Sequence, residues 1–167
     1  MTPEEQQFRA ELVSLLPRLR RFGRAIARHR EDADDLVQIA IERALVRREQ
    51  WEPGTRMLSW MFKIMNNAWI DEMRARTRRD QIFAPEEAGE HVGITPVDAH
   101  LDALAVRSAV ARLNDEQRIA VGLVLVEGLP YKEAAEVLGV PIGTVTSRIA
   151  RAREQLQALL SGADAVR

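Results

Sequence analysis

The chain has 167 residues, of which 46% are hydrophobic and 29% charged, with a formal net charge of -1; this composition suits one ordinary domain or two small ones of roughly 80 residues each. The absence of cysteine excludes a disulfide framework and a thiolate metal site, and three scattered histidines suggest no metal cluster. No apolar run approaches the roughly 18 residues of a membrane span and the N-terminus lacks a signal-peptide layout, so we expect a cytoplasmic protein without membrane insertion.

Three helices are predicted in the first half of the chain. Thr2, Pro3 and Glu5 form the start signal of the first, whose apolar face runs to the RHRED stretch. Acidic residues in EDADD favour the start of a second helix. EQWEPGTR predicts a loop, because Pro and Gly break helices, and MLSWMFKIMNNAWIDEMRARTRR predicts a third helix. The apolar faces of these three helices can share one core.

A linker is predicted over residues 81–95, where Pro, Gly and acidic residues replace large apolar ones. We therefore divide the chain into a domain at 1–80 and a domain at 96–167. Thr95, Pro96 and Asp98 repeat a helix start, and Asn114 with Gln117 caps the next helix, whose run IAVGLVLV is dense enough to be central to a small core. No segment alternates with period two, so the fold class is all-α, with two small helical domains whose relative placement the flexible linker leaves free.

The last two predicted helices, YKEAAEVL and IGTVTSRIARAREQLQALL, are joined across GVP in the manner of a helix-turn-helix. An apolar stripe on the second of them, formed by Val145, Ile149, Ala152 and Leu156, predicts its buried face. The opposite face carries arginines that can bind guanine or phosphate. Helical hairpins that never meet DNA are common, so this spacing alone leaves DNA binding and a solvated charged face both open.

The charges are distributed in two basic clusters. Arginines crowd residues 74–79 and 148–153, and the segment PEEAGEHVGITPVDAHLD between them is acidic. This pattern suggests two contact sites. The near-neutral total predicts that the chain alone holds DNA weakly, because phosphate neutralisation supplies most non-specific affinity.

Three segments together resemble bacterial RNA polymerase sigma factors of the small extracytoplasmic-function group. LPYKEAAEVLGVPIGTVTSRIARAREQL is similar to the C-terminal helix-turn-helix of that group, called region 4. DADDLVQIAIERAL resembles the segment that docks on the polymerase clamp, and PGTRMLSWMFKIMNNAWIDEMRARTRR resembles the promoter-melting segment, both of region 2. The resemblance covers nearly the whole chain in the family's order, and it implies a non-enzymatic protein with a region 2-like domain and a region 4-like domain.

The resemblance also implies three sets of contact residues. Contacts to the upstream (minus-thirty-five) promoter element would come from Lys132, Thr144, Ser147, Arg148 and Arg151. Contacts to the unpaired downstream (minus-ten) element would come from the loop at 51–57 and the helix after it, through Arg56, Asn67, Asp71, Arg74 and Arg78. Contacts to the polymerase would come from Asp32, Asp35, Gln38 and Glu42. No catalytic or metal-binding residue and no cofactor is implied.

Some positions depart from the family's pattern or carry a structural alternative. Leu58 and Asn66 stand where relatives often have arginine, so the promoter preference is not transferred. Trp60 and Trp69 could stack on bases, but they lie in a helix rich in large apolar residues, and we assign Trp60 to the core. Trp51, in the Pro-Gly loop, stays open.

The expected function is therefore that of a promoter-specificity subunit, with core RNA polymerase, promoter DNA and an anti-sigma protein as partners. One alternative is a sigma-like decoy that sequesters an anti-sigma factor without serving the polymerase. A second is a conventional helix-turn-helix regulator, which would leave the N-terminal resemblance unexplained. A helical enzyme is a distant third, because no nucleophile-base pair, phosphate-binding glycine loop or metal-ligand spacing is present.

Overall fold

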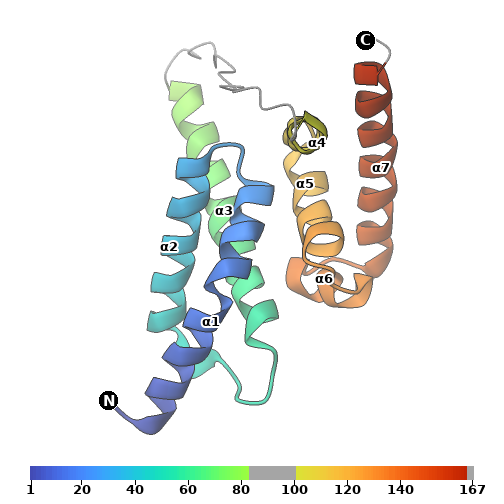
Figure 1. Ribbon diagram of the computed structural model, residues 1–167. Coiled ribbons are helices and arrows are strands. Elements are labelled where there is room, and N and C mark those ends of the chain that lie inside the picture. The colour runs from blue at the N-terminus through green and yellow to red at the C-terminus, as the bar shows by residue number, and fades with distance from the viewer. Residues whose placement is uncertain (83–100, 165–167) are drawn as a thin grey trace.

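The computed structural model describes residues 1–82 and 101–164, and over these ranges the chain is helical with no strand. The all-α prediction is confirmed. The first group of helices is α1 (Pro3–Ile26), α2 (Arg30–Val46), the short 3-10 helix η1 (Arg48–Gln50) and α3 (Met57–Ile82). The second group is α4 (Leu101–Ala111), α5 (Asp115–Val121), the π-helical turn η3 (Gly122–Val126), α6 (Tyr131–Leu138) and α7 (Ile142–Asp164). Figure 1 shows the two groups side by side as separate bundles.

Residues 83–100 lie outside the described part of the chain, and with them most of the predicted linker and the predicted helix start at Thr95, Pro96 and Asp98. The first two linker residues, 81 and 82, are the last two of α3. None of the described helices is both long and apolar enough to cross a bilayer.

The start of α1 follows directly from its sequence. The Thr2 hydroxyl accepts a hydrogen bond from the Glu5 backbone N–H, and the Glu5 carboxylate accepts one from the Thr2 backbone N–H, at 3.2 and 3.0 Å. These two bonds satisfy N–H groups that the first helical turn leaves without partners. The helix then buries one face against α2 and α3, where the rings of Phe22 and Phe62 lie 4.7 Å apart between centroids.

In the second bundle, α5 begins as predicted and ends differently. The Asn114 side chain accepts a hydrogen bond from the Gln117 backbone N–H at 2.8 Å, which confirms the predicted cap. After Val121 the helix widens into η3, where the Glu127 N–H donates to the Gly122 carbonyl at 3.0 Å, five residues back. Gly128 then turns the chain at φ 71°. The sequence gives no signal for this π-helical turn, because it depends on what the helix packs against.

The bundles pack against each other through α1 and α3 on one side and α5, η3 and α6 on the other (Figure 1). Buried residues of both bundles belong to one continuous apolar cluster. Gly122 lies so close to α1 that a Cβ atom there would be 3.1 Å from the Phe22 ring. The composition of the linker predicts bundles whose relative placement is free; the structure instead joins them, because part of the apolar face of α5 and η3 is covered by α1 and not by its own domain.

A buried arginine lies at this contact. The Arg118 guanidinium donates to the carbonyls of Ile26 in α1 and Leu113 in its own bundle, both at 2.7 Å, and forms an ion pair with Asp115. Burial lowers the pKa of Arg118, and the Asp115 carboxylate acts in the opposite direction. Because Arg118 donates to one carbonyl in each bundle, it connects the bundles by hydrogen bonds in addition to their apolar packing.

We expect Arg118→Met to lower the free energy of unfolding by about 2 to 6 kcal/mol, because it leaves two buried carbonyls without a donor at about 1 to 3 kcal/mol each. Arg112→Met, at an exposed position just before α5, is the matched control and should change little. Urea unfolding followed by circular dichroism measures both variants. Equal midpoints for the two variants would contradict the assigned role of Arg118.

Candidate nucleic-acid and polymerase interfaces

The helix-turn-helix consists of α6, a three-residue turn and α7. Gly139 adopts φ 66°, a left-handed conformation that suits glycine, and the Val140 N–H donates to the Ala135 carbonyl at 3.1 Å. This turn directs α7 back across the bundle, where Val145, Ile149 and Ala152 are buried. The predicted apolar stripe is confirmed for these three residues, and Leu156 packs partly buried against the same core.

The predicted upstream-element residues on α7 share one face. Thr144, Ser147, Arg148 and Arg151 are spaced at three, four and seven residues, which places them along one side of a helix. Ser147 and Arg151 are exposed, and Thr144 is partly covered. Lys132 is exposed near the start of α6. The stripe that holds α7 in place and the face that carries the cations therefore lie on different sides of one helix.

Arg148 lies at the edge of this face and turns toward α5. Its side chain is only 22% exposed, and its Nη2 lies 3.7 Å from an Oε2 of Glu116. It lines a groove of about 680 Å³ between the C-terminal half of α3 and helices α5 and α7. Arg74 and Arg78 line the same groove from α3, so cations assigned to different promoter elements share one concavity.

The predicted downstream-element residues on α3 also share a face. Asn67, Asp71, Arg74 and Arg78 are all exposed, at spacings of four, three and four residues. Asp71 forms an ion pair with Arg43 of α2 at 3.1 Å. The face thus carries two arginines near its C-terminal end that pair with no carboxylate in residues 1–82 or 101–164, and an amide nearer its N-terminal end.

Arg56 lies apart from this face, at the other end of α3. It precedes the helix by one residue and is 11 residues from Asn67, a separation of roughly 16 Å along a helix axis. Its Nη1 donates to an Oε2 of Glu133 in α6 at 2.8 Å, and Ser59 donates to the other oxygen of the same carboxylate. The structure therefore does not bring Arg56 together with the other downstream-element residues.

The tryptophans lie in or against the core. Trp69 is 3% exposed, while Trp60 and Trp51 are partly buried, their rings 6.0 and 5.8 Å from the ring of Phe8 between centroids. The assignment of Trp60 to the core agrees with this packing. Asn66, one of the departures from the family's pattern, is also 3% exposed, and its Oδ1 has no hydrogen-bond partner within the described part of the chain.

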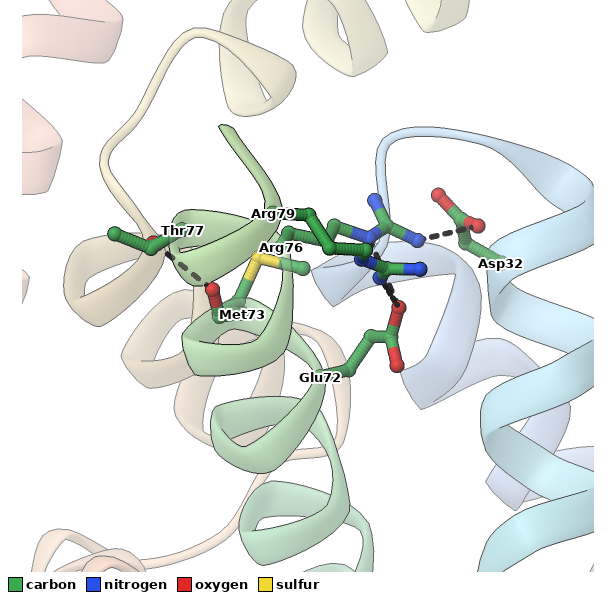
Figure 2. Close-up of polar contacts among 6 residues, drawn as sticks. All are labelled: Asp32, Glu72, Met73, Arg76, Thr77 and Arg79. Carbon is green, nitrogen blue, oxygen red and sulfur yellow. Dashed lines mark hydrogen bonds and ion pairs between the residues drawn. The ribbon is translucent and has the colours of Figure 1, made fainter. Parts of the chain in front are cut away.

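Three of the four predicted polymerase contacts form an exposed row on α2. Asp35, Gln38 and Glu42 are exposed, and the Gln38 amide donates to the Glu42 carboxylate at 3.5 Å. Asp32 differs from them: Figure 2 shows its carboxylate joined to Arg76 of α3, at 2.7 Å. The same arginine contacts Glu72 at 3.1 Å, and Asp32 raises the pKa of Arg76. Asp32 is thus placed to hold α2 on α3.

Several residues at these surfaces were absent from the sequence-based prediction. Glu116 and Glu133 pair with predicted DNA-contacting arginines, and Glu127 is buried at the contact between the bundles. Glu116 and Glu133 lie in helices and Glu127 directly follows η3, which is a common solvated pattern, and only their long-range partners set them apart. Among the described residues, no group of three or more His, Asp or Glu is placed to hold a metal ion.

Comparison with known proteins matches both halves of the chain. Residues 103–156 match the family model for sigma-70 region 4, and residues 12–66 match the sigma2 domain of PhyR. The chain is 33% identical to the ECF RNA polymerase sigma factor EcfG of Rhodopseudomonas palustris over 95% of this chain and 87% of that protein. It is 37% identical to the ECF RNA polymerase sigma factor SigM of Mycobacterium tuberculosis over 85% of this chain and 71% of that protein.

Two solved structures are similar over almost the full length. The sigma factor RpoE of Bartonella quintana, in complex with the anti-sigma factor NepR, has a TM-score of 0.79 and 34% identity, covering 93% of this chain and 98% of that one. CnrH in complex with the cytosolic domain of CnrY has a TM-score of 0.69 and 25% identity, covering 95% and 90%. The fold and its exposed faces define a two-bundle helical protein of the sigma-factor class. The chain belongs to the ECF family of RNA polymerase sigma factors.

We expect substitutions of Asp32 and Asp35 to differ in their effect on the free energy of unfolding. Asp32→Asn removes an ion pair whose arginine is 37% exposed, so it should lower the free energy of unfolding by under about 1 kcal/mol. Asp35→Asn, on the exposed row, should leave it unchanged. Thermal unfolding at low and high salt checks both, and a loss in Asp35→Asn as large as in Asp32→Asn would contradict the assignment.

Proposed function

We propose that this chain is an active sigma factor: it binds core RNA polymerase, reads the upstream promoter element as duplex with α7, and captures the downstream element as a single strand with the loop at 51–57 and α3. The observation that carries the proposal is that α3 and α7, in separate bundles, each present arginines on a face opposite a buried one. Two separate DNA-facing surfaces suit one protein that contacts two promoter elements at once. The chain would act by binding alone, in the cytoplasm where the polymerase works.

Duplex reading by α7 is supported by the chemistry of its exposed face. Arginine donates a bidentate pair to guanine or binds phosphate, and the shorter hydroxyls of Thr144 and Ser147 reach bases or backbone near the start of the helix. Because Val145 and Ile149 anchor the opposite face, this face is held rigidly for insertion into a major groove.

Capture of a melted strand is supported by the mixture of groups on α3. Arg74 and Arg78 suit the phosphate backbone, and the Asn67 amide suits the edge of an extruded base. Unstacking a base costs a few kcal/mol, so strand opening would be driven by the contacts that flipped bases gain.

The exposed row Asp35, Gln38 and Glu42 is proposed as the polymerase-binding surface. Carboxylates and an amide complement a basic and polar partner, and no partner within the described chain covers them. The solved relatives that are bound to anti-sigma proteins support a further partner of that kind for this chain.

Transcription in vitro with purified core polymerase on a promoter library tests the proposal. Transcripts should depend on the chain, and Arg148→Ala with Arg151→Ala should reduce them at least about 30-fold, because each bidentate arginine contributes about 1 to 3 kcal/mol. Arg153→Ala, exposed on the same helix but outside the predicted face, is the control. Binding of the double variant to core polymerase should be unchanged, and undiminished transcription from it would contradict the role of α7.

The same experiment separates the proposal from a decoy that only sequesters an anti-sigma factor. The match of residues 12–66 to the sigma2 domain of PhyR keeps that alternative in view. A decoy would produce no transcript from any promoter with core polymerase. Asp35→Lys should weaken polymerase binding and transcription together, whereas in a decoy it would leave both at background.

We expect Arg74→Ala with Arg78→Ala to make binding of the polymerase complex to forked promoter DNA less dependent on salt. Each phosphate contact to a single strand contributes a slope of about 0.7 in log K against log salt, so the slope should fall by about 1.4. The matched control is Arg79→Ala, because that arginine already pairs with Glu72 at 3.2 Å. An unchanged slope in the double variant would contradict phosphate contacts by α3.

A further inference from the structure

The contact between the bundles includes a buried carboxylate with a partly exposed partner. The Glu127 side chain is fully buried, and its Oε2 accepts from Nε and Nη2 of Arg21 at 3.0 and 2.6 Å. Arg18 donates to the Glu127 backbone carbonyl at 3.2 Å, while the second carboxylate oxygen accepts no hydrogen bond from the described residues. A buried carboxylate with a single ion-pair partner depends strongly on that partner, because an unpaired buried charge is costly. Separation of the bundles would release Glu127 into water.

A second carboxylate at the same contact covers a group assigned to DNA. Glu133, in the first turn of α6, accepts from Arg56 and from the hydroxyl of Ser59, one on each oxygen. A guanidinium and a hydroxyl converging on two oxygens of one anion is also how proteins hold a DNA phosphate. Glu133 thus accepts from Arg56 and Ser59 the same kinds of hydrogen bond that a backbone phosphate could accept.

The α7 face is constrained in the same arrangement. Arg148 lies beside Glu116 and opens onto the groove that α3 closes from the other side, so part of the upstream-element face points at the other bundle. The Arg148–Glu116 pair lies within the second bundle, so the contact between the bundles limits Arg148 only through the groove that it shares with α3. The pair that crosses the bundles is Arg56–Glu133, and there an internal carboxylate competes with DNA for a predicted DNA-contacting cation.

We propose that the bundles form a closed state of the free protein in which Glu133 blocks Arg56 as an internal substitute for a DNA phosphate, with the Arg21–Glu127 pair holding the bundles together. The inference rests on the proposed function in one respect, the contact of Arg56 with the melted strand. Opening of this state would free Arg56 and Ser59 from Glu133, which would restrict contacts of Arg56 with the melted strand to the opened form.

Two variants test the two parts of the closed state separately: Glu133, which blocks Arg56, and the Arg21–Glu127 pair, which holds the bundles together. Glu133→Gln removes the competing charge, and the free protein should bind a random-sequence single-stranded oligonucleotide about two- to five-fold more tightly, the range of an exposed ion pair. The control is Glu136→Gln, exposed on the same helix. Adding Arg56→Ala to Glu133→Gln should abolish the gain; a gain that persists without Arg56, or no gain at all, would overturn the blocking role.

Arg21→Ala leaves Glu127 buried without its partner and should shift the closed-to-open ratio roughly tenfold toward the open form. Because the chain has no cysteine, Val13→Cys and Ile142→Cys, both exposed positions, can carry a fluorescent donor and acceptor, one in each bundle. Energy transfer should fall in Arg21→Ala and stay unchanged in Arg9→Ala, an exposed arginine on the same helix. Unchanged transfer in Arg21→Ala would overturn the closed state.

These measurements need neither polymerase nor a known promoter, so their failure is distinguishable from failure of the proposed function. If the wild-type chain supports no transcription with core polymerase, the sigma-factor activity is refuted. The oligonucleotide-binding and energy-transfer results instead test whether the closed state exists. If both Glu133→Gln and Arg21→Ala raise oligonucleotide binding and only Arg21→Ala lowers energy transfer, the proposal is supported.

Discussion

The hydrogen bonds of one buried guanidinium connect the two halves of this molecule. Arg118 donates to a carbonyl at the end of α1 and to a carbonyl just before α5, so the end of one bundle and the start of the other share a donor. Carbonyls buried without a donor are costly, and the geometry at Arg118 is therefore tightly constrained. α6 packs against α3 at the same contact between the bundles, where Gly122 also approaches Phe22 closely, so the two arginine-bearing helices α3 and α7 line one groove.

The arginines of this protein fall into two groups, which differ in whether they are paired with other groups of the fold. Arg76 and Arg118 are engaged by carboxylates or carbonyls of neighbouring helices and hold the fold together. Arg74, Arg78 and Arg151 are exposed and have no ion pair with any residue that the structure describes, which suits the proposed contacts with a phosphate backbone. Arg56 and Arg148 fall between these classes, because each is exposed enough to reach DNA and yet lies beside an internal carboxylate. A protein with a net charge of -1 has enough carboxylates to pair with the cations that we propose contact DNA, when no DNA is present.

Much of the local structure could be predicted because its causes are local. The Thr2–Glu5 capping box, the Asn114 cap, the Gly139 turn and the stripe Val145–Ile149–Ala152 each depend on residues within two helical turns of one another. The exposed faces of α2, α3 and α7 follow from the same periodicity, since the residues opposite a buried stripe must face outward. The resemblance of three segments to one family supplied the roles of those faces, which spacing alone left open.

The π-helical turn, the burial of Glu127 and the pairing of Asp32 and Arg56 could not be predicted in this way. In each case the deciding partner is distant in sequence: 44 residues separate Asp32 from Arg76, and 77 separate Arg56 from Glu133. An acidic residue in a helix looks the same in sequence whether it faces water or a guanidinium from another bundle. The sequence by itself determined the helices, their caps, the outward faces and the family, because short-range periodicity and capping chemistry specify them. Only the tertiary structure decided which charges are engaged and how the bundles meet, because those depend on burial created by residues far apart along the chain.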